Sequence, residues 1–256
     1  NNDKYNDDES AWYYADGSGN LYAGEFKTIN GKKYAFQNDG RMVSGLKFID
    51  VAAEKAGSMD AKADDNDAMP FDTEDDFLEN APLYEAAGYK CYYFGDGEDG
   101  AMKTGRVTIE IDGDNFTFNF ETSGSKKGQG TTGVDDDKIY QSGMLLKAGS
   151  DEKYQVVEQD LTHETFTKLE DAEAFIAEVN AEKKAPTDVD LDALGITRKA
   201  EDIDELYVIP EYAKDKYILV NTSGKVVDRK SRNKDGNDFI YCVNASGVIK
   251  AIYTEQ

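Results

Sequence analysis

The chain has 256 residues, with 52 acidic and 29 basic side chains and a net charge of −23. Nucleic acids and anionic membrane surfaces attract basic proteins, so this balance argues against both as partners. No segment approaches the ~20 consecutive apolar residues of a membrane span, and we expect no membrane insertion. The first residues contain no basic-then-apolar signal sequence, and we expect a mature chain whose export signal has been removed.

The negative charge is concentrated in two segments. Residues 50–88 contain 12 acidic and 2 basic side chains, and residues 151–212 contain 18 acidic and 6 basic ones. The rest of the chain is close to neutral, so it combines two kinds of sequence. We expect hairpin repeats and acidic, partly helical insertions to alternate along five segments, 1–50, 51–88, 89–150, 151–212 and 213–256.

The less charged segments repeat an aromatic cluster followed by a glycine-containing turn. In the first two copies, Tyr13 corresponds to Tyr34 and Gly19 to Gly40, each 21 residues later. Further copies lie at 91–105 and 116–128, and two less regular ones at 217–225 and 239–248. A repeat of this length indicates an array of small structural units.

Each copy predicts a β-hairpin. Alternating aromatic and β-branched residues favour strands with one packed face, and a turn glycine supplies the positive φ of a tight hairpin. One such hairpin is marginal alone, so the copies must bury their aromatic faces on one another. We therefore predict a mainly β fold of stacked, solenoid-like hairpin repeats, interrupted by acidic insertions with short α-helices. The expected turns are at Asp16-Gly17 or Ser18-Gly19, Asp39-Gly40, Ser123-Gly124, Ser223-Gly224 and Ser246-Gly247.

The first acidic insertion predicts a loop followed by a helix. Residues 52–68 are polar and rich in small side chains, which is typical of a mobile loop. In 70–88, Asp72 or Thr73 can cap a helix. That helix carries Phe77, Leu78 and Leu83.

The second acidic insertion predicts two helices. Thr167 and Glu170 have capping-box spacing, and the apolar residues that follow recur at helical intervals. Pro186, after two lysines, marks the end of this helix. A shorter helix is expected near 198–206, with Ile203 and Leu206 facing inward. The apolar face of the first helix is formed by Leu169, Ala172, Ile176 and Val179, and its end by Lys183 and Lys184.

At the repeats, the sequence resembles the cell-wall-binding (choline-binding or glucan-binding) repeat family of Gram-positive bacteria. The matching runs are WYYADGSGNLYAGEF, KKYAFQNDGRMVSGL and CYYFGDGEDGAMKTGR. The family pattern is an aromatic cluster, an Asp-Gly turn and a Gly-Trp step, spaced roughly 20 residues apart. The match covers 11–50 and 89–130 and is weaker over 213–256, and the acidic insertions have no counterpart in it.

The resemblance implies an exported protein that these repeats hold on the bacterial cell surface. The expected partner is a cell-wall glycan or a teichoic-acid-linked component. An alternative of a different class stays open, namely a structural or adhesive surface protein whose repeats are scaffold and whose acidic insertions bind another protein. Exposed, coplanar aromatic rings favour the first hypothesis, and rings wholly buried between hairpins favour the second.

The ligand-binding candidates are the aromatic residues of the repeats. In the choline-binding branch, the Gly-Trp tryptophan helps to form a cage for a quaternary ammonium group. Here the terminal glycines are followed by Glu25, Leu46 and Arg106, so a complete cage is not expected. Trp12, the only tryptophan, suits either ligand binding or a core role between the first two hairpins, and its early position favours the core role. The candidates are Trp12, Tyr14, Tyr22, Tyr34, Phe36, Tyr92 and Tyr93.

The sequence carries no catalytic motif, and we expect no enzyme. The single histidine, His163, lies among acidic residues, and the chain lacks the G-x-S-x-G sequence of a nucleophile elbow. One histidine cannot supply the two or three that a catalytic zinc needs. Cys91 and Cys242 lie in strand-like runs, where a thiol is usually inert. They are expected to be unpaired, because they belong to distant repeats.

No cofactor is expected. The runs Asp96–Gly100 and Asp112–Asn115 offer clustered oxygen ligands for calcium, but neither has the spacing of an EF-hand loop. Aspartate and glycine are also the usual residues of exposed turns, and we interpret both runs in that way.

Overall fold

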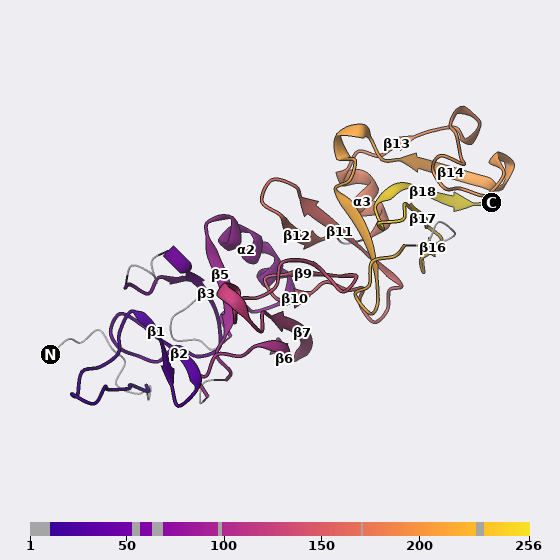
Figure 1. Cartoon of the computed structure of the whole chain (residues 1–256). Coiled ribbons are helices and arrows are strands. Elements are labelled where there is room, and N and C mark those ends of the chain that lie inside the picture. Colours follow the sequence, from indigo (N-terminus) through magenta and orange to yellow (C-terminus); the bar gives the residue numbers. More distant parts are fainter. Residues whose placement is uncertain (1–10, 53–56, 63–68, 97–98, 170, 229–232) are drawn as a thin grey trace. The chain divides into compact units, whose positions relative to one another are not determined.

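The computed structural model describes residues 11–52, 57–62, 69–96, 99–169, 171–228 and 233–256. The fold is mainly β, as expected, and is built from several small antiparallel sheets (Figure 1). The chain forms two compact units, Asn1–Gly130 and Thr131–Gln256. Unit 1 contains the aromatic repeats of the first half of the chain, and unit 2 contains the second acidic insertion.

Unit 1 begins with short stacked hairpins. A β-bridge joins Ala15 to Leu21, and strands β1 (Glu25–Ile29) and β2 (Lys32–Phe36) pair around the turn Asn30-Gly31. Both turn residues have positive φ, 50° and 82°, which is the geometry of a type I′ hairpin turn. A second bridge, between Phe36 and Met42, extends the array.

A larger antiparallel sheet follows in the same unit. Strand β3 (Leu46–Asp50) lies between β4 (Ala61–Lys62) and β5 (Tyr89–Tyr93), so β3 and β5 pair directly across the whole acidic insertion. Within that insertion, helix α2 (Glu74–Ala86) begins at Thr73, whose side chain accepts a hydrogen bond from the Asp76 backbone N–H.

The core of unit 1 is aromatic. Phe77 on α2 packs edge-on against Phe71 and Phe118, with ring centroids 5.0 and 5.4 Å apart, and lies 6.0 Å from Phe48. Phe118 belongs to β7 (Asp114–Phe120), which pairs with β6 (Gly105–Ile111). Phe77 and Leu78 are buried as expected, whereas Leu83 lies on the exposed side of α2.

Unit 2 contains three groups of strands. The first comprises β8 (Gly133–Asp135), β9 (Lys138–Gln141) and β10 (Met144–Leu145). In the second, β11 (Tyr154–Asp160) lies between β12 (Thr165–Lys168) and β15 (Tyr217–Asn221). The third has the order β13-β14-β18-β17-β16. Its strands are β13 (Glu182–Lys183), β14 (Ile203–Val208), β16 (Asn233–Lys234), β17 (Ile240–Val243) and β18 (Ile249–Glu255).

Helix α3 (Ala172–Glu178) covers the core of unit 2 and is shorter than expected. It begins at Asp171, whose carboxylate accepts from the Ala174 backbone N–H, and not at the predicted capping box. Thr167 instead lies in β12, where it pairs with Glu158. The helix ends before the two lysines, and its fully buried side chain is Phe175.

The second predicted helix of this insertion, near 198–206, is wrong. Residues Ala200–Asp202 form one 3-10 turn, and strand β14 begins at Ile203. Both Ile203 and Leu206 are buried, as expected, because an irregularity in the β14–β18 register lies between them. Two further 3-10 turns are Pro186–Asp188 and Glu211–Ala213, and a third, Gly124–Lys126, lies in unit 1.

Four of the five expected turns are tight glycine turns, with Gly19, Gly40, Gly224 and Gly247 at positive φ. Ser123-Gly124 instead opens the 3-10 turn of unit 1. In the 52–68 segment, Ala61 and Lys62 form a strand and not a loop, while 53–56 and 63–68 lie outside the described residues.

Three of the glycine turns share a structure that we call the Asx-Gly turn, formed by residues 16–19, 221–224 and 244–247. The side chain of the first residue in each turn caps backbone N–H groups of the turn. In 244–247, the Oδ1 atom of Asn244 accepts from the backbone N–H groups of Ser246 and Val248 at 2.9 and 3.0 Å. The Gly247 N–H then donates to the Asn244 carbonyl oxygen. Asn221 and Asp16 make the equivalent contacts.

Candidate functional site

The first hairpins align three aromatic rings in one row. The Tyr22 backbone N–H donates to the Tyr14 carbonyl oxygen at 3.0 Å, which brings the two side chains together. Their rings stack with centroids 6.0 Å apart and an interplanar angle of 9°. Tyr22 also contacts Phe36, at 5.8 Å and 46°. Tyr22 is therefore the middle ring of a row of three aromatic side chains.

Large apolar side chains of the same hairpin are open to solvent. Trp12 is 58% exposed, Tyr13 48% and Tyr14 44%, and the neighbouring Leu21 is 53% exposed. Trp12 is held through its backbone, because its carbonyl oxygen accepts from the Met42 N–H at 2.8 Å. Trp12 therefore does not have the core role that its position in the chain favoured. We call Trp12, Tyr13, Tyr14 and Leu21 the aromatic surface. Within it Tyr14 lies on the face of Tyr22, and Tyr13 and Leu21 lie on the other face of the hairpin, next to Gly40.

Strand β1 brings two charged side chains to the same row. The β1–β2 register sets Glu25 opposite Phe36 and Lys27 opposite Tyr34, so all four side chains share one face of the hairpin. The Lys27 ammonium lies 4.5 Å from the centroid of the Tyr22 ring, and its Nζ is 4.0 Å from a Glu25 carboxylate oxygen. The sequence signal that could have indicated these two residues is the spacing of Glu25 and Lys27, two residues apart in a strand pattern.

The two candidates of the third repeat lie apart from this row. Tyr92 is buried, contacts Phe26 at 5.3 Å and accepts a hydrogen bond on its hydroxyl oxygen from the Gln129 Nε2 at 3.2 Å. Tyr93 stacks on Phe120, at 6.3 Å. Burial, with a smaller effect of the nearby Asp96 charge, raises the pKa of Tyr93. Both rings are part of the packing of unit 1.

Of the seven sequence candidates, the structure thus gathers Tyr14, Tyr22 and Phe36 in contact, with Tyr34 on the same hairpin face. Trp12 is exposed and is joined to Met42 through its backbone. Phe36 is only 1% exposed, so it packs against Tyr22 from the buried side and offers little surface to a ligand. Tyr13 and Leu21 were not candidates, because alternation alone does not tell which side of a hairpin lacks a covering layer.

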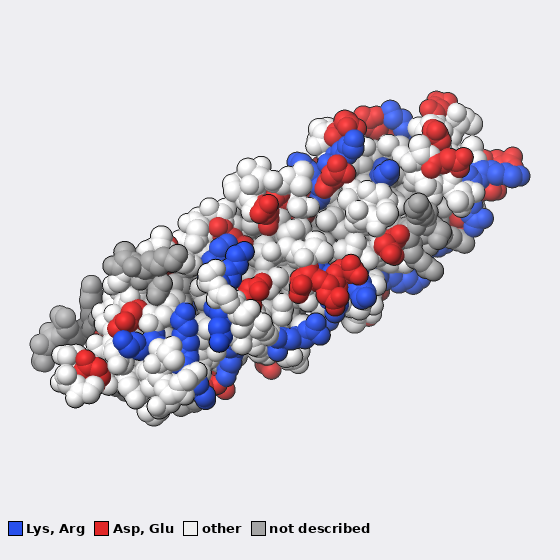
Figure 2. Space-filling view, viewed as in Figure 1, with Lys and Arg blue, Asp and Glu red and all other residues white. Residues whose placement is uncertain are grey.

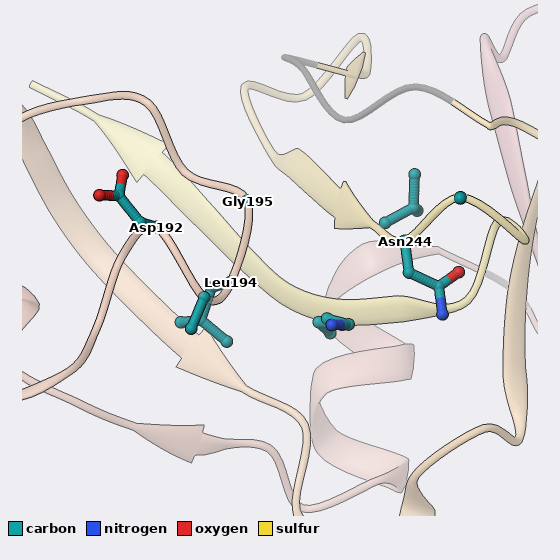
Figure 3. A pocket seen from close by; sticks show the side chains of 8 residues that line it. Asp192, Leu194, Gly195 and Asn244 are labelled. Carbon is teal, nitrogen blue, oxygen red and sulfur yellow. The ribbon is translucent and has the colours of Figure 1, made fainter.

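Unit 2 contains hollows that the sequence did not indicate. One of about 340 Å³ is lined by Asp192, Leu194, Gly195 and Asn244 (Figure 3). A larger one, of about 770 Å³, has exposed Leu161 at its rim and carboxylates in its lining. The carboxylates belong to Asp137, Asp215 and Asp228, and the lining also includes Lys225.

His163 lies in an exposed turn between β11 and β12. Its Nδ1 is 2.8 Å from the Asp160 carboxylate, which also accepts from the Thr162 backbone N–H. These hydrogen bonds, that of His163 foremost, lower the pKa of Asp160 to about 2. The histidine and the carboxylate therefore stabilise the turn.

The two cysteines are free and buried. Burial raises the pKa of both thiols, that of Cys242 to about 12, so neither is poised as a nucleophile. Within the part of the chain that the structure describes, no three His, Cys, Asp or Glu side chains are grouped so that they could hold a metal ion. Asp112 lies in the β6–β7 turn with φ 52°, and Glu98 lies outside the described residues.

Acidic and basic side chains are interspersed on the visible face of each unit (Figure 2). Among the helices in the described ranges, none is long and apolar enough to cross a membrane.

No protein-family model matches the sequence, and no curated protein matches it. Among solved structures, the chain is similar to choline binding protein F of Streptococcus pneumoniae, with 19% identity and a TM-score of 0.18. That similarity covers 54% of this chain and 45% of choline binding protein F. A second similar structure is CbpJ of Streptococcus pneumoniae, with 14% identity and a TM-score of 0.34 over 94% of this chain and 84% of CbpJ.

Proposed function

We propose that this protein is a non-catalytic protein of the bacterial cell surface, which attaches to the cell wall through the aromatic surface of its first hairpins. The ligand class is a cell-wall glycan or a teichoic-acid-linked component. Secretion is part of the proposal, because such ligands lie outside the cell membrane.

The observation that carries the proposal is the exposure of three consecutive aromatic side chains. Trp12, Tyr13 and Tyr14 are 58%, 48% and 44% exposed, and Leu21, which lies next to Gly40 together with Tyr13, is 53% exposed. Soluble proteins rarely leave large apolar groups together in solvent, and such patches mark binding surfaces. Tyrosine and tryptophan suit a ligand that is apolar on one face and polar at its edge, because each ring has an apolar body and a polar tip. Sugars have this character.

The described chemistry favours binding over catalysis. His163 pairs with Asp160 in an exposed turn, and both thiols are buried with raised pKa values. Neither arrangement supplies an activated nucleophile next to a base. The aromatic surface, by contrast, needs no ionised group to hold a sugar ring.

Sedimentation with purified peptidoglycan, prepared with and without teichoic acid, tests the proposal. We expect the native protein to sediment with the wall and a Trp12→Ala/Tyr13→Ala variant to stay in solution. Tyr212→Ala is the matched control, because Tyr212 is a 65% exposed aromatic residue of unit 2. It should sediment normally.

Comparison of the two wall preparations identifies the ligand. Equal binding to both indicates the glycan, and binding that requires teichoic acid indicates the attached polymer. A native protein that sediments with neither preparation contradicts the proposal and favours the scaffold alternative. If the Tyr212→Ala control loses wall binding to the same extent, the aromatic surface is not the specific binding site.

A further inference from the structure

The first hairpins already hold a cation on their aromatic row. The Lys27 ammonium lies 4.5 Å from the centroid of the Tyr22 ring, within the range of a cation–π contact. We infer that Lys27 is a built-in competitor, which keeps external ammonium groups off Tyr22 and thereby restricts the first hairpins to ligands that do not bind through a cation. Its biological meaning rests on the proposed binding role of these hairpins, whereas the contact itself can be tested without a cell wall.

The Tyr22 ring is where an external cation would be expected to bind. An ammonium group binds best over an aromatic face with further rings close by. Tyr22 has such neighbours, because it stacks on Tyr14 at 6.0 Å and contacts Phe36 at 5.8 Å. Lys27 therefore lies at the centre of the row, over Tyr22, the ring where an external cation would bind best.

Three features keep the lysine in place. Its Nζ is 4.0 Å from the Glu25 carboxylate, which lies two residues away on the same face of β1. Its backbone is fixed opposite Tyr34 by the β1–β2 pairing. Its side chain is 40% exposed, so the stem lies along the hairpin while the ammonium keeps part of its hydration.

The contact of Lys27 with the Tyr22 ring is intramolecular. It forms without the loss of translational and rotational freedom that a free ammonium ligand pays on binding, so such a ligand reaches the ring only by displacing Lys27. Removal of the Lys27 charge, by substitution or by acylation of the amine, leaves the Tyr22 ring open to a small quaternary ammonium ion.

The same strand pair supplies a matched control. The Lys33 ammonium also lies 4.5 Å from a ring centroid, that of Phe26. Phe26, however, is on the other face of the hairpin, where it packs against Tyr92 and Phe94 with centroids 5.3 and 6.1 Å away. Loss of Lys33 therefore uncovers a ring that belongs to the packing of unit 1.

Titration with tetramethylammonium chloride at constant ionic strength tests the inference. The readout is the NMR shift of the ring protons of Tyr14, which stacks on Tyr22, in the native protein and in the variants Lys27→Ala, Lys33→Ala and Lys27→Ala/Tyr22→Ala. We expect Lys27→Ala to bind the ion about fivefold more tightly than the native protein, the gain that a single exposed cation–π contact supplies. Lys33→Ala should bind like the native protein, and the gain should vanish in Lys27→Ala/Tyr22→Ala.

A Lys27→Ala variant that binds no better than the native protein overturns the inference. So does an equal gain in Lys33→Ala. Lys27→Gln keeps most of the stem and serves in place of Lys27→Ala if that variant is misfolded. Because these titrations contain no cell wall, a failure of wall sedimentation and a failure of this inference give separate results.

Discussion

The first hairpin and strand β7 have the same kind of sequence and opposite environments. Both place aromatic residues at short intervals, yet Trp12 and Tyr14 are 58% and 44% exposed, whereas Phe118 and Phe120 are fully buried. The difference lies in what covers them. Phe118 is covered by Phe77 of helix α2, which the acidic insertion supplies. An aromatic repeat is thus core where a second layer covers it and exposed where none does.

The largest effect that follows from this comparison concerns Phe118. It is 0% exposed and contacts Phe77 and Phe120 at 5.4 and 6.1 Å. Phe118→Ala should lower the free energy of unfolding by about 3–5 kcal/mol, the usual effect of removing a buried ring. Urea denaturation measures this, and a loss under about 1 kcal/mol would contradict the core role.

A smaller effect is expected at the Asx-Gly turns. The Asn244 Oδ1 atom accepts from the backbone N–H groups of Ser246 and Val248, and Asn244→Ala leaves both N–H groups without this acceptor. The expected loss is about 1 kcal/mol, as for other side chains that cap backbone groups. Asn244→Asp keeps the acceptor oxygen and is the matched control at neutral pH. Equal destabilisation by both substitutions would show that the capping contact is not the cause.

Trp12 gives the counterpart to Phe118. Because Trp12 is exposed and held through its backbone, Trp12→Ala should change the free energy of unfolding by no more than about 0.5 kcal/mol. The same variant, with Tyr13→Ala, is expected to lose wall binding. If Trp12→Ala lowers the melting temperature as much as Phe118→Ala does, Trp12 packs in the core, and the proposed difference between the two regions is wrong.

The smallest effect is a pH dependence confined to the first hairpin. Backbone N–H groups of Asn20 and Ser18 donate to the Asp16 carboxylate and lower its pKa. The ionised form is favoured in the folded turn, so its contribution is complete above the unfolded pKa of about 3.9 and is lost as the pH falls through the lower folded value.

Amide hydrogen exchange and NMR shifts between pH 6 and 2 measure this effect. The Ser18 and Asn20 amides should respond in acid, and the Ser246 and Val248 amides should not, because Asn244 has no proton to gain. A response at both turns would indicate general unfolding and not titration of Asp16.

The sequence predicted four of the glycine turns because glycine at positive φ leaves a local signal, but it missed the Asn30-Gly31 turn of the β1–β2 hairpin. It did not reveal the Asx residue that caps three of these turns, although Asn221 and Asn244 stand three residues before the turn glycine. This contact is equally local, and the spacing of Asx to Gly would have indicated it.

The errors lie where tertiary pairing overrides a local pattern. Ile203 and Leu206 have helical spacing, but an irregularity in strand β14 turns both inward. Thr167 has the spacing of a capping box, yet its β-branched side chain belongs to β12. In each case a distant strand decides the outcome.

The candidate site was predictable in composition and not in exposure. Tyr14, Tyr22 and Phe36 were candidates because aromatic residues are densest in the first repeats, whereas their contact depends on the backbone pairing of Tyr22 with Tyr14. Which face of this hairpin is exposed depends on which other elements pack against it. Strand alternation in the sequence does not predict that.

Direct pairing of β3 with β5 also makes unit 1 modular. The strands meet from Leu46 opposite Tyr93 to Asp50 opposite Tyr89, so the acidic segment is a loop whose two ends are joined at the base. The entropy of closing such a loop grows only with the logarithm of its length, by about 0.6 kcal/mol for each doubling. The acidic segment can therefore be lengthened without loss of the β3–β5 pairing, provided that Phe71 and helix α2, which pack in the core, are kept.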